Sequence, residues 1–373
     1  MLLSTLLTII AISVRCVVAS GTAQKPLPAA SDTSPLIDLH KSLVEISSIS
    51  GSERSVSDFL KGYLQDSGFT VEAQTVEDDR QNIFAYMGKS RKAKVLATSH
   101  IDTVPPFWPY ERKGDEIWGR GSVDAKGSIA AQVIAVKSLL DDGQIKEGDV
   151  SLLFVVGEEN SGAGMREANN LGLSWDAVIF GEPTELKLAS GHKGGIGFAI
   201  TAKGKAGHSG YPEMGKNSID ILVKGLAALQ KLELPSSEEF GNSTLNVGTI
   251  QGGVAANVIP QDASATALIR LAGGSPEETI GLIQKALHEA SPELEIESRG
   301  GRGPVSIDHD IEGFDTAVMN YGTDIPNLKG DHKRYLYGPG TILVAHSDHE
   351  HLKISDLEAA VEGYKILITK NLK

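Results

Sequence analysis

The stretch GIGFAITAKG, residues 195–204, marks the point where the pattern of the sequence changes. It is typical of a strand, and it is followed by a helical segment, two strand-like segments, a second helical segment and a last strand. These lie at 217–232, 244–253, 263–273, 275–290 and 293–298. The order β-α-β-β-α-β is that of a ferredoxin-like unit, which folds as a domain in its own right. We therefore expect a separate domain at 191–300.

The sequence on both sides of this unit has the pattern of an α/β domain. Amphipathic helices are expected from Pro35, after a leader at 21–34, and again up to Gly68. Short apolar runs at 83–86, 95–98, 150–156 and 177–180 are interleaved with a helix at 129–140, and another helix is expected at 354–369. Apolar strands between helices indicate a sheet buried on both faces. Glycines at 300–303 suggest an exit linker, so the second domain is inserted into a first domain formed by 35–190 and 301–373.

The composition argues against nucleic acid as a partner, and the first residues suggest a secretory route. The chain has 373 residues with a formal net charge of -13, which argues against nucleic acid. Residues 1–20 form an apolar run ended by small residues, which indicates a secretory signal. The alternative is a membrane anchor, but the uninterrupted apolar part of this run, residues 2–14, is shorter than the ~20 residues needed to span a bilayer. Cys16 lies inside the expected signal, and Asn242 begins a glycosylation sequon.

Two segments place acids beside a histidine or a glycine-rich turn. In ATSHIDTVP, Asp102 follows His100 by two residues, so it can orient the imidazole as metal-binding histidines require. The same pair can also be an ordinary surface pair. In GRGSVDAKGSIAA, Asp124 stands where a helix begins, either as a ligand or as a helix cap. The glycines match neither the dinucleotide-binding spacing nor the P-loop spacing.

Two further segments carry carboxylates directly after buried strands. LLFVVGEENSG runs into Glu158 and Glu159, and AVIFGEPTE runs into Glu182. Unpaired carboxylates at a buried strand end need a metal or another cation. Together with His100, Asp124 and one late histidine they form a mixed set of ligands that suits Zn²⁺, and a shared carboxylate allows two ions ~3.5–4 Å apart.

The order of these motifs closely resembles one family. It is similar to the motif order of the zinc exopeptidases and deacylases. The motifs in this chain are, in order, H-x-D, G-x-x-D-x-K-G, E-E, G-E-P-T and a late histidine with Glu four residues on. That family includes glutamate carboxypeptidase, acetylornithine deacetylase, succinyl-diaminopimelate desuccinylase and aminoacylase. The resemblance covers nearly the whole chain after residue 34, and it implies a zinc-hydrolase catalytic domain with a mixed sheet and an inserted lid or dimerisation domain.

The resemblance also implies a role for each motif residue. His100 and Glu182 would each bind one zinc ion with Asp124 bridging, and Glu159 with a C-terminal histidine would complete the two metal shells. Asp102 would support His100, and Glu158 would be the general base toward a water whose pKa zinc lowers to about 7. Many members carry an acid where this chain has Gly157, which concerns the tuning of the site rather than metal binding.

Residues of the inserted domain are expected to contact substrate. GKAGHSGYPEMGKNSI resembles the segment whose histidine, here His208, assists the oxyanion, in dimeric members from the partner subunit. AANVIPQDASATALIR resembles the segment whose Asn257 and Arg270 hold substrate. An arginine fork is well matched to a carboxylate. His208 as part of a glycine-rich turn, and Arg270 as a strand-end ion pair, remain alternatives.

The stretch VAHSDHEHLK, residues 344–353, offers three histidines for one ligand position. We expect His346 to be the ligand because it follows an apolar, strand-like run, TILVA. His349 and His351 are then solvated neighbours, and Glu350 supports the loop.

The leading hypothesis is a secreted carboxypeptidase with two zinc ions per subunit, acting on peptides and without stable membrane association. A monomer and a homodimer formed through the inserted domain both remain alternatives. The alternative is an N-acyl amino acid deacylase, since both reactions attack an amide beside a free carboxylate. A binding protein that has lost catalysis would show damage to the ligands or the base, and the sequence shows neither.

Overall fold

The computed structural model describes residues 34–373, apart from the side chain of Arg299. The expected signal at residues 1–20 with its Cys16, and the leader as far as residue 33, lie outside the described residues. Pro35–Lys373 form one compact unit. In the described part of the chain, no helix is both long enough and apolar enough to cross a membrane.

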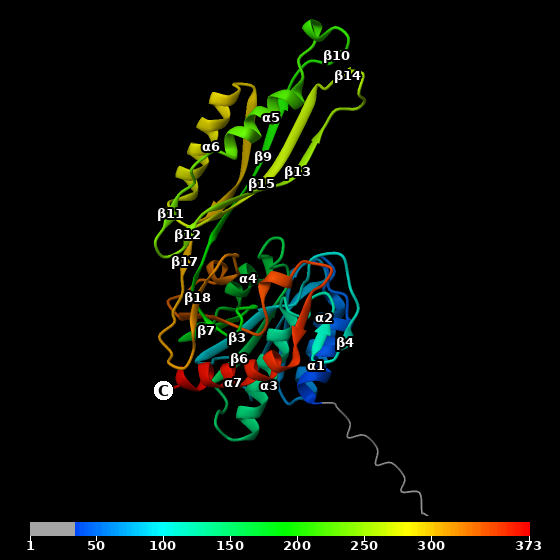
Figure 1. Cartoon of the computed structure of the whole chain (residues 1–373). Helices are drawn as coiled ribbons and strands as arrows, with labels where there is room; N and C mark the ends of the chain where they lie inside the picture. Colours follow the sequence, from blue (N-terminus) through cyan, green and yellow to red (C-terminus); the bar gives the residue numbers. More distant parts are fainter. Residues whose placement is uncertain (1–33) are drawn as a thin grey trace, which may run out of the picture. The chain divides into compact units, whose positions relative to one another are not determined.

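The catalytic part is built on a six-stranded mixed sheet (Figure 1). Its four neighbouring strands β6, β3, β7 and β19 run parallel, while β1 and β2 are antiparallel at one edge. The strands are, in spatial order, β1 (Thr70–Glu77), β2 (Arg80–Tyr86), β6 (Val150–Val155), β3 (Val95–His100), β7 (Ala177–Gly181) and β19 (Lys333–Tyr337). This arrangement confirms the expected mixed α/β class.

Both faces of this sheet are buried, as the continuous apolar strands predict. Successive residues of β3 show it, because Val95 and Ala97 belong to one apolar cluster and Leu96 belongs to another. The first cluster includes residues of α1 (Pro35–Glu45), α2 (Arg54–Asp66), α3 (Lys126–Asp141) and α7 (Ile354–Lys370). The second includes residues of α4 (Ala163–Ala168) and of the 3₁₀ helix η3 (Ile325–Asn327).

Smaller elements carry the loops around the sheet. One three-stranded sheet joins β4 (Glu111–Lys113), β5 (Glu116–Trp118) and β20 (His351–Lys353), and another joins β8 (Leu188–His192), β17 (Val305–Ser306) and β18 (Thr316–Met319). The strand expected at TILVA is wrong, because 342–344 form a 3₁₀ helix, η4 (Ile342–Val344), with Thr341 as its N-cap. A further 3₁₀ helix, η1 (Asn169–Leu171), follows α4.

The inserted domain has the predicted order of elements. The main elements are, in chain order, β9 (Gly194–Lys203), α5 (Ser218–Leu229), β13 (Thr244–Gly252), β15 (Asp262–Leu271), α6 (Pro276–Ala290) and β16 (Leu294–Arg302). The four strands form an antiparallel sheet with the order β13-β15-β9-β16. Both helices pack on one face of it (Figure 1), and alternate residues of β9 are buried against them. Asn217 caps α5, and a capping box of Ser275 and Glu278 starts α6, which explains where both helices begin.

The inserted domain differs from expectation at its exit. Gly300 and Gly301 do not form a linker, because β16 continues to Arg302 and pairs Gly301 with Ile196 across a bulge. At the other end of the sheet lie the short strands β10 (Gly207–His208) and β14 (Val258–Ile259) and the 3₁₀ helix η2 (Pro212–Met214). A second short pair, β11 (Ser236–Ser237) with β12 (Gly241–Asn242), precedes β13.

Candidate metal centre and active site

Three parallel strands bring expected site residues to one edge of the main sheet. His100 is the last residue of β3, Glu182 follows the end of β7, and Glu158 and Glu159 come shortly after β6. The carboxyl ends of parallel strands meet at one edge, where α/β proteins build their sites. Asp124 comes from the turn before α3, and His346 from the loop after η4. Five segments that are distant in sequence therefore meet at this edge.

Asp124 lies between the two histidines. Its Oδ1 is 3.1 Å from Nε2 of His100, and its Oδ2 is 3.3 Å from Nε2 of His346. On one side Nε2 of His100 is also 3.7 Å from Oε1 of Glu182, and on the other Nε2 of His346 is 3.0 Å from Oε2 of Glu159. The arrangement is two groups of donors that share one carboxylate.

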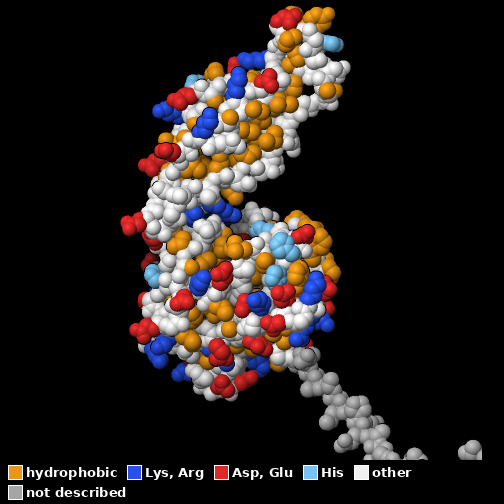
Figure 2. Space-filling model, viewed as in Figure 1, with side chains coloured by type: hydrophobic (Ala, Val, Ile, Leu, Met, Phe, Trp, Pro, Cys, Tyr) orange, Lys and Arg blue, Asp and Glu red, His pale blue; other side chains and the backbone are white. Residues whose placement is uncertain are grey.

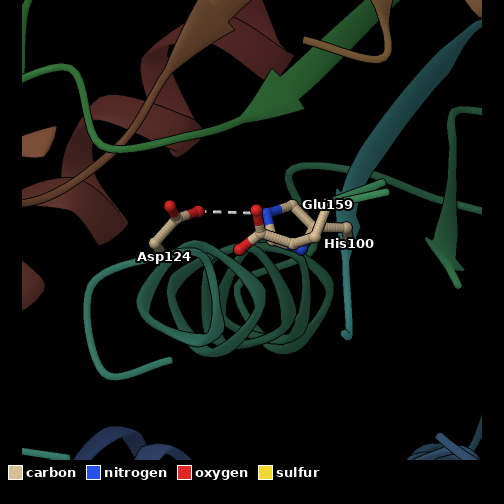
Figure 3. Close-up of side chains that lie close together, drawn as sticks. All are labelled: His100, Asp124 and Glu159. Atoms are coloured by element: carbon tan, nitrogen blue, oxygen red, sulfur yellow. Dashed lines mark hydrogen bonds and ion pairs between the residues drawn. The ribbon is translucent and has the colours of Figure 1, made fainter. Parts of the chain in front are cut away.

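Figure 3 shows His100, Asp124 and Glu159 pointing toward one another from a strand, a helix start and a loop. One ligand atom from each lies within 4.8 Å of the others. Asp124 does not cap α3, whose N-cap is Ala125 without a side-chain bond. The helix-cap alternative for Asp124 is thus not what the structure shows.

The donor set fits metal cations. The side chains of Asp124, Glu159 and Glu182 are each exposed by less than a tenth, and among residues 34–373 only histidines lie within ion-pair distance of them. Three buried carboxylates facing two imidazoles need further positive charge. Mixed imidazole and carboxylate donors at this spacing suit two divalent ions that share a carboxylate.

The pKa values of several of these residues are shifted because their carboxylates and imidazoles are buried close together. Burial raises the pKa of Glu182 to about 7, although the facing His100 lowers it. Burial also raises the pKa of Glu159, with the Asp124 carboxylate adding to the effect. Hydrogen bonds to Asp124 and Glu159 raise the pKa of His346 to about 10. These shifts describe a site whose acids and imidazoles share protons that metal ions would displace.

Asp102 holds both the histidine and the loop of the two glutamates. Nδ1 of His100 lies 2.9 Å from the backbone oxygen of Asp102 and 3.5 Å from its Oδ1. The Asp102 carboxylate accepts the backbone N–H groups of Glu158 at 3.0 Å and Glu159 at 3.2 Å, and the hydroxyl of Ser50 at 2.7 Å. One buried carboxylate therefore fixes two of the segments that build the site.

Glu158 lies at the edge of an open space. It lines a cavity of about 420 Å³ whose other lining residues include His192, Arg302 and Asp324. Burial, together with the Glu182 charge, raises the pKa of Glu158 well above its ordinary value. A carboxyl group with a raised pKa that borders a cavity has the properties of a general acid or base.

The loop of the two glutamates leaves no room for a side chain at Gly157. This residue has φ 75°, and a Cβ there would lie 2.6 Å from Nη2 of Arg80. Arg80 in turn forms a buried ion pair with Glu53 at 2.6 Å. The guanidinium fills the space that an acidic side chain at position 157 would need.

The expected substrate residues divide between the two ends of the inserted domain. His208 in β10 and the neighbouring Asn257 are both exposed, and Asn257 accepts the backbone N–H of Ser209. Arg270 lies near the opposite end of β15, a strand of ten residues or roughly 30 Å. It is close to Gly322 of the catalytic part, where a Cβ would be 3.7 Å from Nη1 of Arg270. A single chain therefore does not gather these three residues at one place.

The three C-terminal histidines have different surroundings. His346 faces Asp124 and Glu159, His349 is exposed and contacts the neighbouring Asp348 carboxylate, and the ring of His351 stacks on Trp118 at 4.8 Å. Glu350 is buried and bonds the loop of Asp124, as expected for a loop support. Its partner Arg120 was missed, although it lies inside the quoted GRGSVDAKG motif.

Comparisons with known proteins agree with this geometry. A sequence model described as the M20 peptidase dimerisation domain matches residues 190–295. A probable carboxypeptidase of Aspergillus clavatus is 44% identical, over 95% of this chain and 96% of that protein. The chain belongs to the M20 peptidase family. It is a metal-dependent peptide hydrolase of that family, with the dimerisation domain inserted in the catalytic domain.

Further members of the M20 family show the same relationship. A peptidase M20 domain-containing protein of Schizosaccharomyces pombe is 48% identical over 94% of this chain and 87% of that protein. The M20 metallo-carboxypeptidase Sso-CP2 from Sulfolobus solfataricus shares the fold, with a TM-score of 0.75 at 18% identity over 91% of this chain and 100% of that one. YXEP of Bacillus subtilis, described as a dinuclear metal-binding peptidase of the M20 family, also shares the fold. Its TM-score is 0.64 at 16% identity, over 90% of this chain and 97% of that one.

Proposed function

We propose that this M20 peptidase is a zinc-dependent carboxypeptidase that binds two zinc ions per subunit. The shared position of Asp124 between His100 and His346 is the observation that carries the proposal. Glu182 would complete the site of His100, and Glu159 the site of His346. Relatives named probable carboxypeptidase and a structural neighbour named a dinuclear metal-binding peptidase support it.

When bound, the two ions would supply Lewis-acid polarisation of the scissile carbonyl and would lower the pKa of the attacking water. The chain's own part is carried by Glu158, whose carboxylate takes a proton from that water and returns it to the leaving nitrogen. Its raised pKa places the carboxyl group nearer to the operating pH than a free glutamate would be. Asp102 keeps this base in place through the backbone N–H of Glu158.

Arg270 is the proposed anchor for the substrate carboxylate. Burial lowers the pKa of its guanidinium, and among the described residues no carboxylate lies within ion-pair distance of it. Arg270 as a strand-end ion pair is therefore not what the structure shows. A guanidinium without a protein partner beside the Glu158 cavity can bind the C-terminal carboxylate of a peptide.

We further propose a homodimer in which His208 and Asn257 act on the active site of a second copy. Both residues lie on the end of the inserted domain that is far from Arg270, so a second chain is needed to bring them to a scissile bond. The visible surface of the inserted domain carries hydrophobic side chains (Figure 2), and Ile250, Val254 and Met214 are among its exposed apolar residues. A matched dimerisation domain supports this assembly.

Secretion belongs to the same proposal. The apolar residues 1–20 support it, as does the sequon at Asn242, which is exposed in β12 and available to a glycan. We propose that Asn242 is glycosylated on this route.

The deciding experiment is a substrate panel measured on enzyme of known metal content. We expect cleavage of N-blocked dipeptides with a free C-terminal carboxylate and little turnover of N-acetyl amino acids. Turnover of the acetyl series alone would replace the carboxypeptidase with the N-acyl amino acid deacylase.

A further inference from the structure

The loop that carries the shared ligand is held by a group outside the ligand set. Asp124 follows the turn after β5, and Glu350 lies four residues after His346. Both Glu350 and Arg120 are only 2% exposed, so their charges are buried next to the metal centre. A buried carboxylate is retained only where its oxygens are paired, so its partners reveal what it does.

All partners of the Glu350 carboxylate belong to the loop of Asp124. Oε2 is 2.5 Å from Nη1 of Arg120, and Oε1 accepts the backbone N–H of Gly121 at 2.8 Å. The backbone N–H groups of Val123 and Asp124 point at the same Oε1 from 3.4 Å. Glu350 thus contacts the backbone of the shared ligand itself.

The backbone around Glu350 joins the same two loops. Its carbonyl accepts the N–H of Gly119 at 3.2 Å, and the following β20 pairs with β5, His351 opposite Trp118. Arg120 also donates to the carbonyl of Pro106 at 3.2 Å. The Asp124 loop and the end of the His346 loop therefore form one hydrogen-bonded unit.

His346 depends on such support more than the other histidine ligand does. His100 is buried at the end of a central strand, whereas the side chain of His346 is 51% exposed. His346 lies in the loop after a 3₁₀ helix, and its own backbone has φ 61°. A left-handed backbone conformation at a non-glycine residue persists only when the surrounding structure fixes it. Glu350 is the buried group in that loop that can provide this.

We propose that Glu350 is a positioning residue which, with Arg120, ties the His346 loop to the Asp124 loop and so sets the metal subsite of Asp124, Glu159 and His346. The inference rests on the two-ion assignment of the proposed function. Its specific consequence is unequal weakening of the two subsites. Loss of Glu350 disturbs Asp124, which both subsites share, and also the loop of His346, which belongs to only one of them, so the subsite of His346 weakens more than that of His100 and Glu182.

The test is a calorimetric titration of metal-free protein with Zn²⁺ at pH 8, repeated with Co²⁺ while its visible absorption is recorded. Burial raises the pKa of Glu350 to about 7, so the group is ionised there. Glu350→Gln keeps the shape and removes the charge. Arg120→Lys is the second variant in case Glu350→Gln does not fold, and Glu358→Gln, on an exposed position of α7, is the control.

We expect two binding events in the wild-type and control proteins. In Glu350→Gln one event should weaken by about 10–100-fold, the usual range for an outer partner of a ligand, and the other event should weaken less, with the larger change in the Co²⁺ spectrum at the more weakened site. Two unchanged events, or equal weakening of both, would overturn the role of Glu350 and leave the proposed function standing. A wild-type protein that binds no metal would overturn both.

Discussion

The Nε2 atom of His100 lies 3.1 Å from Oδ1 of Asp124, and the other oxygen of the same carboxylate faces His346 at 3.3 Å. One carboxylate that serves two imidazoles from opposite sides is the geometry of a shared ligand. It favours the proposed two-ion centre over a single-ion site with one extra acid nearby.

Replacing the shared carboxylate should disturb both metal positions. Asp124→Asn keeps the shape but loses the charge, so we expect fewer than two zinc ions per chain and a loss of turnover beyond the ~10–100-fold typical of an outer partner. Metal analysis of the purified variant measures it. Asp348→Asn, an exposed acid on the loop of His346, is the matched control and should keep both ions.

Substitutions of the two adjacent glutamates should have different effects, one on catalysis and the other on metal binding. Glu158→Gln should retain the metal content and lose roughly 10²–10⁴-fold in kcat, because the general base is gone. Glu159→Gln should lose metal, since Oε2 of Glu159 faces His346 at 3.0 Å. A Glu158→Gln enzyme with nearly full turnover would refute the base assignment.

The histidines of residues 346–351 should differ sharply. His346→Ala removes a donor to Asp124 and Glu159, so we expect it to lose zinc, whereas His349→Ala and His351→Ala should keep it. Zinc content of the three variants, prepared in parallel, checks the assignment. Equal loss from His349→Ala would show that His346 is the wrong imidazole.

Arg270 should act on substrate affinity through the terminal carboxylate. Arg270→Met should raise KM for blocked dipeptides by roughly 10–100-fold, the value of a charge-assisted bidentate pair. C-terminally amidated substrates should be equally poor for both enzymes. Lys224→Met, at an exposed position of α5, controls for loss of charge from the inserted domain. A loss of kcat with unchanged KM would argue against carboxylate binding.

A mixing experiment tests whether His208 acts across a dimer. Neither His208→Ala nor Glu158→Gln should be active alone, but a 1:1 mixture that exchanges subunits should recover about a quarter of wild-type activity, because half of the dimers then have one intact site. No recovery despite proven exchange would mean that His208 does not serve a partner's site.

The sequence predicted which side chains would meet at this edge of the sheet, because each expected ligand lies at a recognisable strand end or turn. His100 is the last residue of a buried strand, Glu159 and Glu182 come shortly after buried strands, and such ends meet at one edge of a parallel sheet. The strand predicted at TILVA was wrong because a short apolar run fits a strand or a helical turn equally. Thr341 caps a helical turn at this position.

Contacts between distant residues could not be read from the sequence. Arg120 and Glu350 are 230 positions apart, and no local pattern indicates that a guanidinium and a carboxylate will be buried together. Likewise, the Arg80 guanidinium that fills the space beside Gly157 comes from β2, which is distant in sequence but lies beside β6 in the sheet. Pairings of this kind depend on how the elements pack.

The most direct test of the two-ion centre is a crystal structure with anomalous data collected at the zinc absorption edge. The proposed two-ion centre predicts two peaks ~3.5–4 Å apart on either side of the Asp124 carboxylate, one beside His100 and Glu182 and the other beside His346 and Glu159. A single peak, or peaks away from Asp124, in fully active crystals would contradict it.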